Sequence, residues 1–288
     1  SLLQQLYTAT RQMLKRGIDN LPSRADQIKN IKLTTLALIP ECSHQMEKII
    51  RLWQYMEPAY FTSHEPEDLA WQTTDILTHT NKKPLIVVRE TLDNEENRRS
   101  KVFIYIYNQP NLFAATVAAL DQMNLIIQDA TIFTSSNNFA TYTFTVLERD
   151  GSAINKNSPR VSLIQRHLKK VLTSPEHFPS LIQRRTPRQL RHFSSEPVVL
   201  LSSHIKSKKV ELNIVATDRP GLLALIGKTF MKLAIEVHRA KIATFGEKVE
   251  DFFIITSAKS LLDDKHHCET IYNQMTQVLK AATARGSL

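Results

Sequence analysis

Hydrophobic residues recur at two different periods along the chain, and the change of period divides it. Up to about residue 81, apolar side chains return every three or four positions, which is the spacing of amphipathic helices. This pattern predicts helices over Ser23–Ile39, Ser43–Met56 and Pro66–Thr78. From Lys82 onward, short runs of β-branched and aromatic residues alternate with helical patterns, which predicts a fold that mixes strands with helices.

An internal repeat organises the chain after residue 82. Adding 110 to each residue number lays the segment from Val102 on the segment from Leu212 without a gap. Each copy then reads strand, helix, strand, strand, helix. The predicted ranges are Val102–Tyr107, Leu112–Met123, Leu125–Thr134, Phe139–Leu147 and Pro159–Leu172 in the first copy, and Val210–Ala216, Leu222–Leu233, Ile235–Phe245, Val249–Ser257 and Lys265–Ala282 in the second.

These elements predict an α+β fold in which helices cover one face of an antiparallel sheet. A ferredoxin-like sheet needs a final strand beside the first, but the residues after Ala282 are poor strand material. Each copy has instead an extra apolar run before its first strand, at Leu85–Val88 and at Val198–Leu201. We therefore expect this preceding strand to fill the vacant edge by pairing with the strand that follows it.

Composition and charge exclude several classes of protein. Hydrophobic residues make up 42% of the chain, yet no apolar run approaches the roughly 20 residues that cross a bilayer, and no signal-peptide pattern is present. The two cysteines, Cys42 and Cys268, are far apart in sequence, which favours the cytoplasm. The net charge of +9 permits an acidic partner, but the densest basic run, Arg184–Phe193, is flanked by prolines. A solvated linker is therefore expected there, and neither a membrane nor a nucleic acid as partner.

A turn that could bind an anion lies between the first strand and first helix of the second copy. It reads Asp218, Arg219, Pro220 and Gly221, and Leu222 follows. Asp218 is expected to cap the helix, and Pro220 to lie in its first turn, where N–H groups have no intrahelical partner. Gly221 lacks a side chain that would keep a carboxylate or phosphate away from these N–H groups. Many such turns bind nothing, so the turn alone does not establish a site.

The matching turn of the first copy carries Asn108, Gln109 and Asn111. Asn108 keeps the Asx-type cap, but Asn111 replaces the glycine and Gln109 replaces the arginine. The second turn is therefore expected to be the better ligand site. A ligand site formed between the two copies is the alternative.

Residues that could form a catalytic or metal centre are scarce. The sequence has no nucleophile elbow and no His–Asp dyad. Glu247, Glu250 and Asp251 are close in sequence, and we expect them to lie on a solvated hairpin. No catalytic residue, metal ligand or cofactor is predicted in this chain.

Several segments resemble known proteins. Val215–Leu223 and Val237–Thr244 resemble ACT domains, small regulatory units that bind amino acids. The longer run Arg239–Thr256 resembles the last ACT module of the bifunctional PII uridylyltransferase/uridylyl-removing enzymes, the GlnD family. In the same family, Leu2–Thr10 resembles the helix after the hydrolase domain, Tyr60–Trp71 the helical connector, and Tyr107–Ala115 the first ACT module.

The resemblance implies four segments. They are a helical connector over residues 1–81, a first ACT domain over 82–175, a basic linker over 176–195 and a second ACT domain over 196–288. The paired aspartates that hold magnesium in the family's nucleotidyltransferase domain are absent, as is the His–Asp pair of its hydrolase domain. The chain therefore resembles the C-terminal regulatory part of such an enzyme, and magnesium is expected only in catalytic domains that it lacks.

The resemblance also implies a function. Enzymes of this family transfer UMP to a tyrosine of the PII signalling protein and remove it again, and glutamine favours removal. The ACT pair is then the expected glutamine receptor, with the ligand carboxylate on the N–H groups of Gly221 and Leu222, and its ammonium on Asp218. Arg219 would either shape the site or be solvated. The alternative is a structural ACT pair that docks PII or self-associates without binding a ligand. A regulator unrelated to nitrogen signalling is disfavoured by Tyr60–Trp71.

Overall fold

The computed structural model describes residues 23–40, 42–80, 83–92, 98–175, 196–203, 209–257 and 265–284. The expected linker at 176–195 and the segment Leu2–Thr10 lie outside these ranges. Two compact units are present, the first ending at Thr78 and the second beginning at His79.

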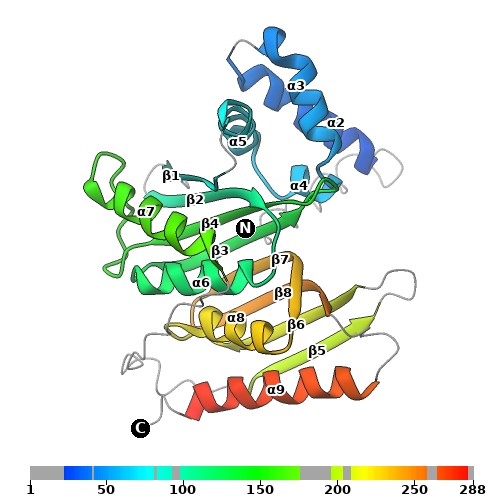
Figure 1. The fold of residues 1–288 in the computed structure, drawn as a ribbon, viewed down its shortest axis with the longest axis vertical. Coiled ribbons are helices and arrows are strands. Elements are labelled where there is room, and N and C mark those ends of the chain that lie inside the picture. Colours follow the sequence, from blue (N-terminus) through cyan, green and yellow to red (C-terminus); the bar gives the residue numbers. More distant parts are fainter. Residues whose placement is uncertain are drawn as a thin grey trace, which may run out of the picture. The chain divides into compact units, whose positions relative to one another are not determined.

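The first unit is helical (Figure 1). Ser23 begins it as a helix cap, because its Oγ accepts a hydrogen bond of 3.1 Å from the backbone N–H of Asp26. Tyr60 and Trp53 are buried in its core, and each donates a hydrogen bond there. The Tyr60 hydroxyl donates to Gln72 at 2.7 Å, and Trp53 Nε1 donates to Thr73 Oγ1 at 3.0 Å. Helix α4 adds a short element that the hydrophobic pattern did not predict. The helices are α2 (Arg24–Leu38), α3 (Cys42–Gln54), α4 (Pro58–Thr62) and α5 (Pro66–Thr78).

The second unit is built on one eight-stranded antiparallel sheet with the order β1-β2-β4-β3-β7-β8-β6-β5 (Figure 1). We call β1 to α7 the first module and β5 to α9 the second module. The α+β fold predicted from the repeat is confirmed. The elements are β1 (Leu85–Leu92), β2 (Arg98–Tyr107), α6 (Leu112–Gln122), β3 (Ile126–Thr134), β4 (Phe139–Leu147), α7 (Pro159–Thr173), β5 (Val198–Ser203), β6 (Val210–Thr217), α8 (Leu222–Lys232), β7 (Ile235–Phe245), β8 (Lys248–Ser257) and α9 (Lys265–Ala284).

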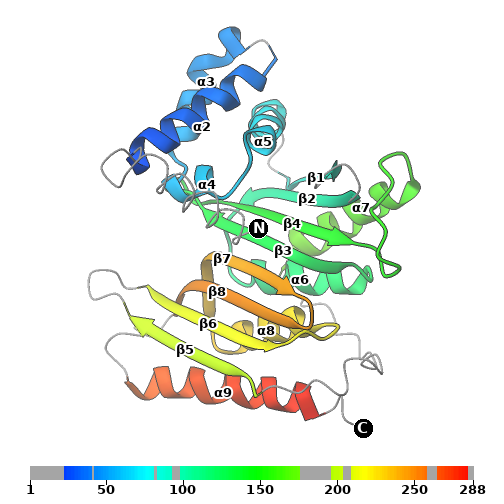
Figure 2. The ribbon, with the colours of Figure 1, turned by 180° about the vertical axis from the view of Figure 1, so that it is seen from behind.

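The outer strands confirm the expected hairpins. β1 pairs antiparallel with β2, so that Val88 lies opposite Val102. β5 pairs in the same way with β6, and Val198 lies opposite Val215. In each module the strand that precedes the repeat therefore takes the edge position of the missing final strand, as the strands in Figure 2 show from the side opposite α6 and α8.

The two modules are joined by a pairing that is symmetric in the repeat. β3 pairs with β7, and Thr131 lies opposite Lys241, its own counterpart 110 residues later. The pair Asp129–Ala243 likewise has the pair Phe133–Arg239 as its counterpart. A local two-fold axis therefore passes through the centre of the sheet, and equivalent surfaces of the modules face each other across it.

Helices α6 and α8 lie side by side on one face of the sheet (Figure 1). They approach closely at Gly227, where an added Cβ would lie 2.8 Å from Cγ2 of Val117 and 3.0 Å from Cα of Ala114. Val117 and Gly227 are repeat counterparts. The axis therefore places a valine on one helix against a glycine on the other, and only the glycine leaves room for that valine.

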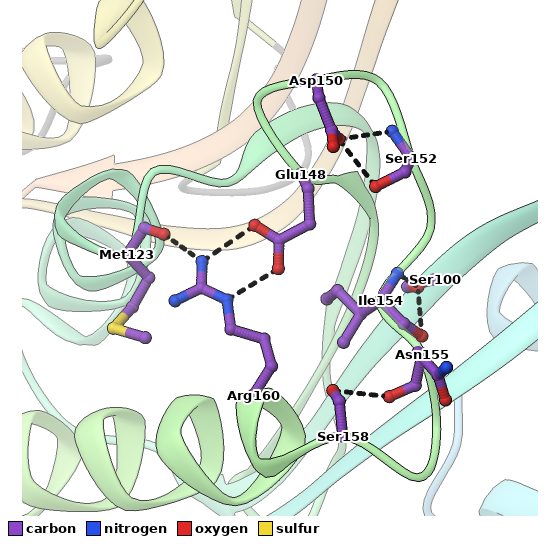
Figure 3. Close-up of polar contacts among 9 residues, drawn as sticks. All are labelled: Ser100, Met123, Glu148, Asp150, Ser152, Ile154, Asn155, Ser158 and Arg160. Carbon is purple, nitrogen blue, oxygen red and sulfur yellow. Dashed lines mark hydrogen bonds and ion pairs between the residues drawn. The ribbon is translucent and has the colours of Figure 1, made fainter.

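Polar contacts fix the start of α7 in the first module (Figure 3). The Arg160 guanidinium makes two hydrogen bonds to the Glu148 carboxylate, of 2.6 and 3.0 Å, and a further one to the backbone carbonyl of Met123. Nearby, the backbone N–H of Ile154 donates to Ser100 Oγ at 2.7 Å. These bonds tie the end of α6 and the end of β4 to the first turn of α7.

Candidate functional site

The strand-to-helix turn of the second module is a β-turn that precedes α8. The Leu222 N–H donates to the Arg219 carbonyl at 3.0 Å. Gly221 has φ 79° and ψ 6°, which are the angles of the third residue of a type II turn, and Pro220 suits the second position. The predicted cap at Asp218 and the predicted place of Pro220 in the helix are therefore wrong. The N–H of Leu222 is already used within the turn.

The remaining residues of this turn are held by neighbouring strands and by burial. The Asp218 N–H donates to the carbonyl of Glu247, in the hairpin between β7 and β8, at 2.8 Å. The Arg219 side chain is buried, with 6% of its surface exposed, so it is not the solvated residue that one of the alternatives described. Burial lowers the pKa of its guanidinium.

The turn of the first module keeps the same backbone with different side chains. Asn111 has φ 64° and ψ 5°, almost the angles of its counterpart Gly221, and asparagine adopts this left-handed conformation more readily than most residues. The Asn108 N–H donates to the carbonyl of Asn138 at 2.8 Å, as the Asp218 N–H does in its own hairpin. Gln109 Nε2 donates to the carbonyl of Leu172 at 3.1 Å. The predicted Asx cap is also absent at this helix.

A cavity lies beside the turn of the first module, on its boundary with the second module. Its free volume is about 20 Å³, which is room for roughly one water molecule. An amino acid would therefore need its walls to move apart. The three candidate residues of the first turn all line it, together with side chains from β4, α6, α8 and β7. The lining residues are Asn108, Gln109, Asn111, Leu112, Phe113, Ala114, Tyr142, Phe230, Met231, Ile235, Glu236 and Val237.

One acidic residue is placed differently from the sequence-based expectation. Asp251 lies on β8 and has only 4% of its surface exposed, whereas the neighbouring Glu250 is exposed. The expectation that Asp251 belongs to a solvated hairpin is therefore wrong. In β8 it is opposite Ile214 of β6 and Ile242 of β7, both buried on the helix-covered face. Strict alternation along the strand, from Val249 through Asp251 to two further apolar residues, was the signal that could have found it.

The pKa values of both Asp251 and Asp218 are raised. Burial and, to a smaller extent, the nearby charge of Asp218 raise the pKa of Asp251 to about 8, and the backbone N–H of Ala243 acts in the opposite direction. Burial also raises the pKa of Asp218, which the backbone N–H of Arg219 partly offsets. Two carboxyl groups that share a poorly solvated place do not both ionise readily, so the pair retains a proton near neutral pH.

Replacing Asp251 by asparagine is expected to change how stability depends on pH. The folded protein keeps a proton on Asp251 up to about pH 8, whereas the unfolded chain loses it near pH 4. The wild type should therefore lose stability as pH rises from about 4 to about 8, by up to about 1 kcal/mol per pH unit, and the Asp251→Asn variant should lack this component.

Urea unfolding of both proteins at pH 5, 6, 7 and 8 measures this difference directly. The variant should be the more stable protein at pH 8, and the gap should narrow toward pH 5. Equal pH slopes for the two proteins would show that Asp251 is not the residue that takes up the proton. Glu250→Gln is the matched control, because Glu250 is adjacent but exposed.

Two absences concern the described residues only. No group of three or more His, Cys, Asp or Glu side chains among them lies close enough to hold a metal ion. No helix in the described ranges is both long enough and apolar enough to cross a membrane.

Comparison with known proteins matches both the helical unit and the whole chain. Residues 23–75 match the family model described as the uridylyltransferase GlnD fifth domain. Bifunctional uridylyltransferase/uridylyl-removing enzymes of Pseudomonas aeruginosa, Pseudomonas entomophila and Pseudomonas putida are each 40% identical to the chain, over 100%, 99% and 98% of its length. The chain spans about a third of these relatives, 32%, 32% and 31% of their lengths. These matches identify the chain as a relative of the C-terminal part of the bifunctional uridylyltransferase/uridylyl-removing enzymes.

Proposed function

We propose that this chain is the glutamine-sensing regulatory region of an enzyme that attaches UMP to the PII signalling protein and removes it. The supporting likeness is to relatives whose names give both activities, uridylyl transfer and uridylyl removal. In this proposal the two modules bind glutamine, and the bound state favours removal of UMP. PII is the protein substrate of the complete enzyme.

The observation that carries the proposal is the cavity at the boundary of the modules. Asn108 and Asn111 line it from the first module, while Met231 and Glu236 line it from the second. A ligand that enters it touches both modules, so its binding energy depends on their arrangement. A ligand with different affinities for two arrangements shifts the population between them, which is the requirement for allosteric control.

The chemistry of the turns suits an amino acid. Amide side chains both donate and accept hydrogen bonds, so Asn108, Gln109 and Asn111 can recognise a carboxylate or a side-chain amide. In the second turn, Asp218 can meet an ammonium group. The carboxylate of the ligand would there bind the Gly221 N–H, because the Leu222 N–H already donates to the Arg219 carbonyl.

Isothermal titration of the chain with L-glutamine tests the proposal. Glutamine is expected to bind, and L-glutamate of the same size to bind at least about tenfold more weakly, since a buried site that matches an amide leaves polar groups unpaired with a carboxylate. Asp218→Ala and Asn108→Ala are a matched pair, since they remove counterpart residues from the two turns. Each should weaken binding at its own turn only.

The alternative of a structural module pair predicts a different result. It predicts no heat with glutamine at millimolar concentration and no effect of Asp218→Ala on the function of the complete enzyme. That outcome, with the protein folded, would contradict glutamine sensing by this chain. If glutamine binds, both alanine variants are next tested in the complete enzyme. There they should reduce the effect of glutamine on removal of UMP from PII.

A further inference from the structure

The two modules differ chemically at one buried position that faces their helices. Asp251 occupies it in the second module, opposite Ile214 and Ile242. The repeat counterparts of these isoleucines lie opposite Tyr142 in the first module. Tyr142 is therefore the structural counterpart of Asp251, although the two residues are not 110 positions apart. The hairpin between β7 and β8 is one residue shorter than that between β3 and β4, so the offset of 110 no longer holds after it.

Tyr142 lines the cavity beside the first turn. The local two-fold relation therefore places Asp251 beneath the second turn, at the position from which Tyr142 meets the first. The effect of the Asp218 charge on the pKa of Asp251 supports this placement, because it requires the two carboxyl groups to be near each other. The second turn thus has two acidic residues where the first has Asn108 and Tyr142.

Asp251 is costly to bury in its observed surroundings. Its side chain is 4% exposed, and its Oδ1 has no hydrogen-bond partner among the described residues. A buried acceptor without a donor lowers the stability of the fold, and the cost is larger when the group is charged. Such groups in native proteins are associated with function, because a bound ligand can supply the missing donor.

Two other charged residues lie near the turn. Asp121 of α6 lies against the turn, with its Oδ1 3.7 Å from the position of a Cβ on Gly221, and it adds a further carboxyl group. The Arg219 guanidinium is buried in the same turn. The raised pKa values of Asp251 and Asp218 have other causes, which are burial and, for Asp251, the charge of Asp218. Three carboxyl groups, those of Asp121, Asp218 and Asp251, therefore lie near the second turn together with the guanidinium of Arg219.

We infer that Asp251 and Asp218 together form a buried acceptor for the ammonium group of an amino acid in the second module, and that the first module has no such acceptor. This inference rests on the proposed amino-acid sensing and adds a division between the two turns. An ammonium group supplies N–H donors and the opposite charge, so it satisfies Asp251 Oδ1 and favours ionisation of both carboxyl groups. The second module then requires a ligand ammonium at a buried acid pair, whereas Glu236, the carboxylate that lines the cavity beside the first turn, is exposed.

Proton release gives this inference a readout that a structural role of Asp251 would not produce. Because the acid pair keeps a proton near neutral pH, an arriving ammonium group must displace it into solvent. Binding at pH 7 should therefore release up to about one proton per ligand in the second module. Affinity should rise between pH 6 and pH 8 and then level off, as the pair becomes ionised before the ligand arrives.

The experiment is titration of the chain with L-glutamine in two buffers of different ionisation enthalpy, which separates proton release from the heat of binding. The same titrations use Asp251→Asn and the exposed control Glu250→Gln. A second ligand is the analogue of glutamine in which hydrogen replaces the α-ammonium group. Asp251→Asn should bind glutamine at least about tenfold more weakly at one of the sites and should lose the proton release, whereas the analogue should bind both proteins equally.

Each outcome decides between the two proposals. Wild-type affinity and proton release in Asp251→Asn would overturn the ammonium acceptor and leave glutamine sensing intact. If the wild type does not bind glutamine but binds another L-amino acid, and Asp251→Asn weakens that binding, glutamine sensing is wrong and the ammonium acceptor is supported. If no L-amino acid binds the folded wild type, both proposals are wrong.

Discussion

Gly227→Val is expected to destabilise the paired modules by about 3 kcal/mol and to abolish the proposed glutamine binding. An added Cβ alone would lie 2.8 Å from Val117 Cγ2 and 3.0 Å from the backbone Cα of Ala114, both closer than ordinary contact. The larger valine forces α6 and α8 apart, and such overpacking costs about 1–3 kcal/mol or more. Urea unfolding measures the loss, and titration with glutamine reports whether the cavity survives.

A double-mutant cycle separates this clash from a general effect on the helix. Gly227→Ala and Val117→Ala are made singly and together, and the pair is expected to be more stable than the sum of the single changes predicts. The reason is that Val117→Ala removes the methyl group nearest to the new Cβ. Additive effects, or an unchanged stability of Gly227→Val, would show that the helices are not in close contact at this point.

Phe113→Ala is expected to have the second large effect, a loss of about 3–5 kcal/mol. Phe113 of the first module contacts two rings of the second: its centroid lies 5.8 Å from that of Phe230 and 5.7 Å from that of Phe253. The rings of Phe230 and Phe253 also meet edge to face, at 5.1 Å. Aromatic clusters of this kind add to the stability that burial provides. The three residues therefore form an apolar contact between modules.

Thermal and urea unfolding of Phe113→Ala test this contact. Phe245→Ala is the matched control, because Phe245 is 46% exposed and its removal should change stability by no more than about 0.5 kcal/mol. A loss in Phe113→Ala no greater than in the control would contradict a shared core. Phe113 also lines the cavity, so the variant should admit ligands with less opening of the walls.

Local patterns were sufficient to predict most of the elements. The repeat predicted β4 over Phe139–Leu147 and β7 over Ile235–Phe245 without an error in either end. It also led to the correct edge pairing of β1 and β5, because a ferredoxin-like sheet leaves one position that these apolar runs can fill. These successes depend on spacing over a few residues, which the sequence records directly.

The helix cap predicted at Asp218 is wrong because two local sequence rules compete in this turn. Asp218 before a helix suggests a cap, but the pair Pro220–Gly221 is also the signature of a type II turn, and the turn geometry prevailed. The cavity could not be predicted in the same way. It depends on the register between β3 and β7 and on the approach of α6 to α8, both of which join residues more than 100 positions apart.

The symmetric pairing of β3 with β7 has a consequence for divergence. Two identical chains meeting at this axis would set glycine against glycine or valine against valine, leaving a gap or a clash. A single chain that carries both halves can hold one of each, as it does at Gly227 and Val117. Covalent linkage of the halves therefore lets each half mutate alone, so that the two modules can acquire unequal surfaces around one axis.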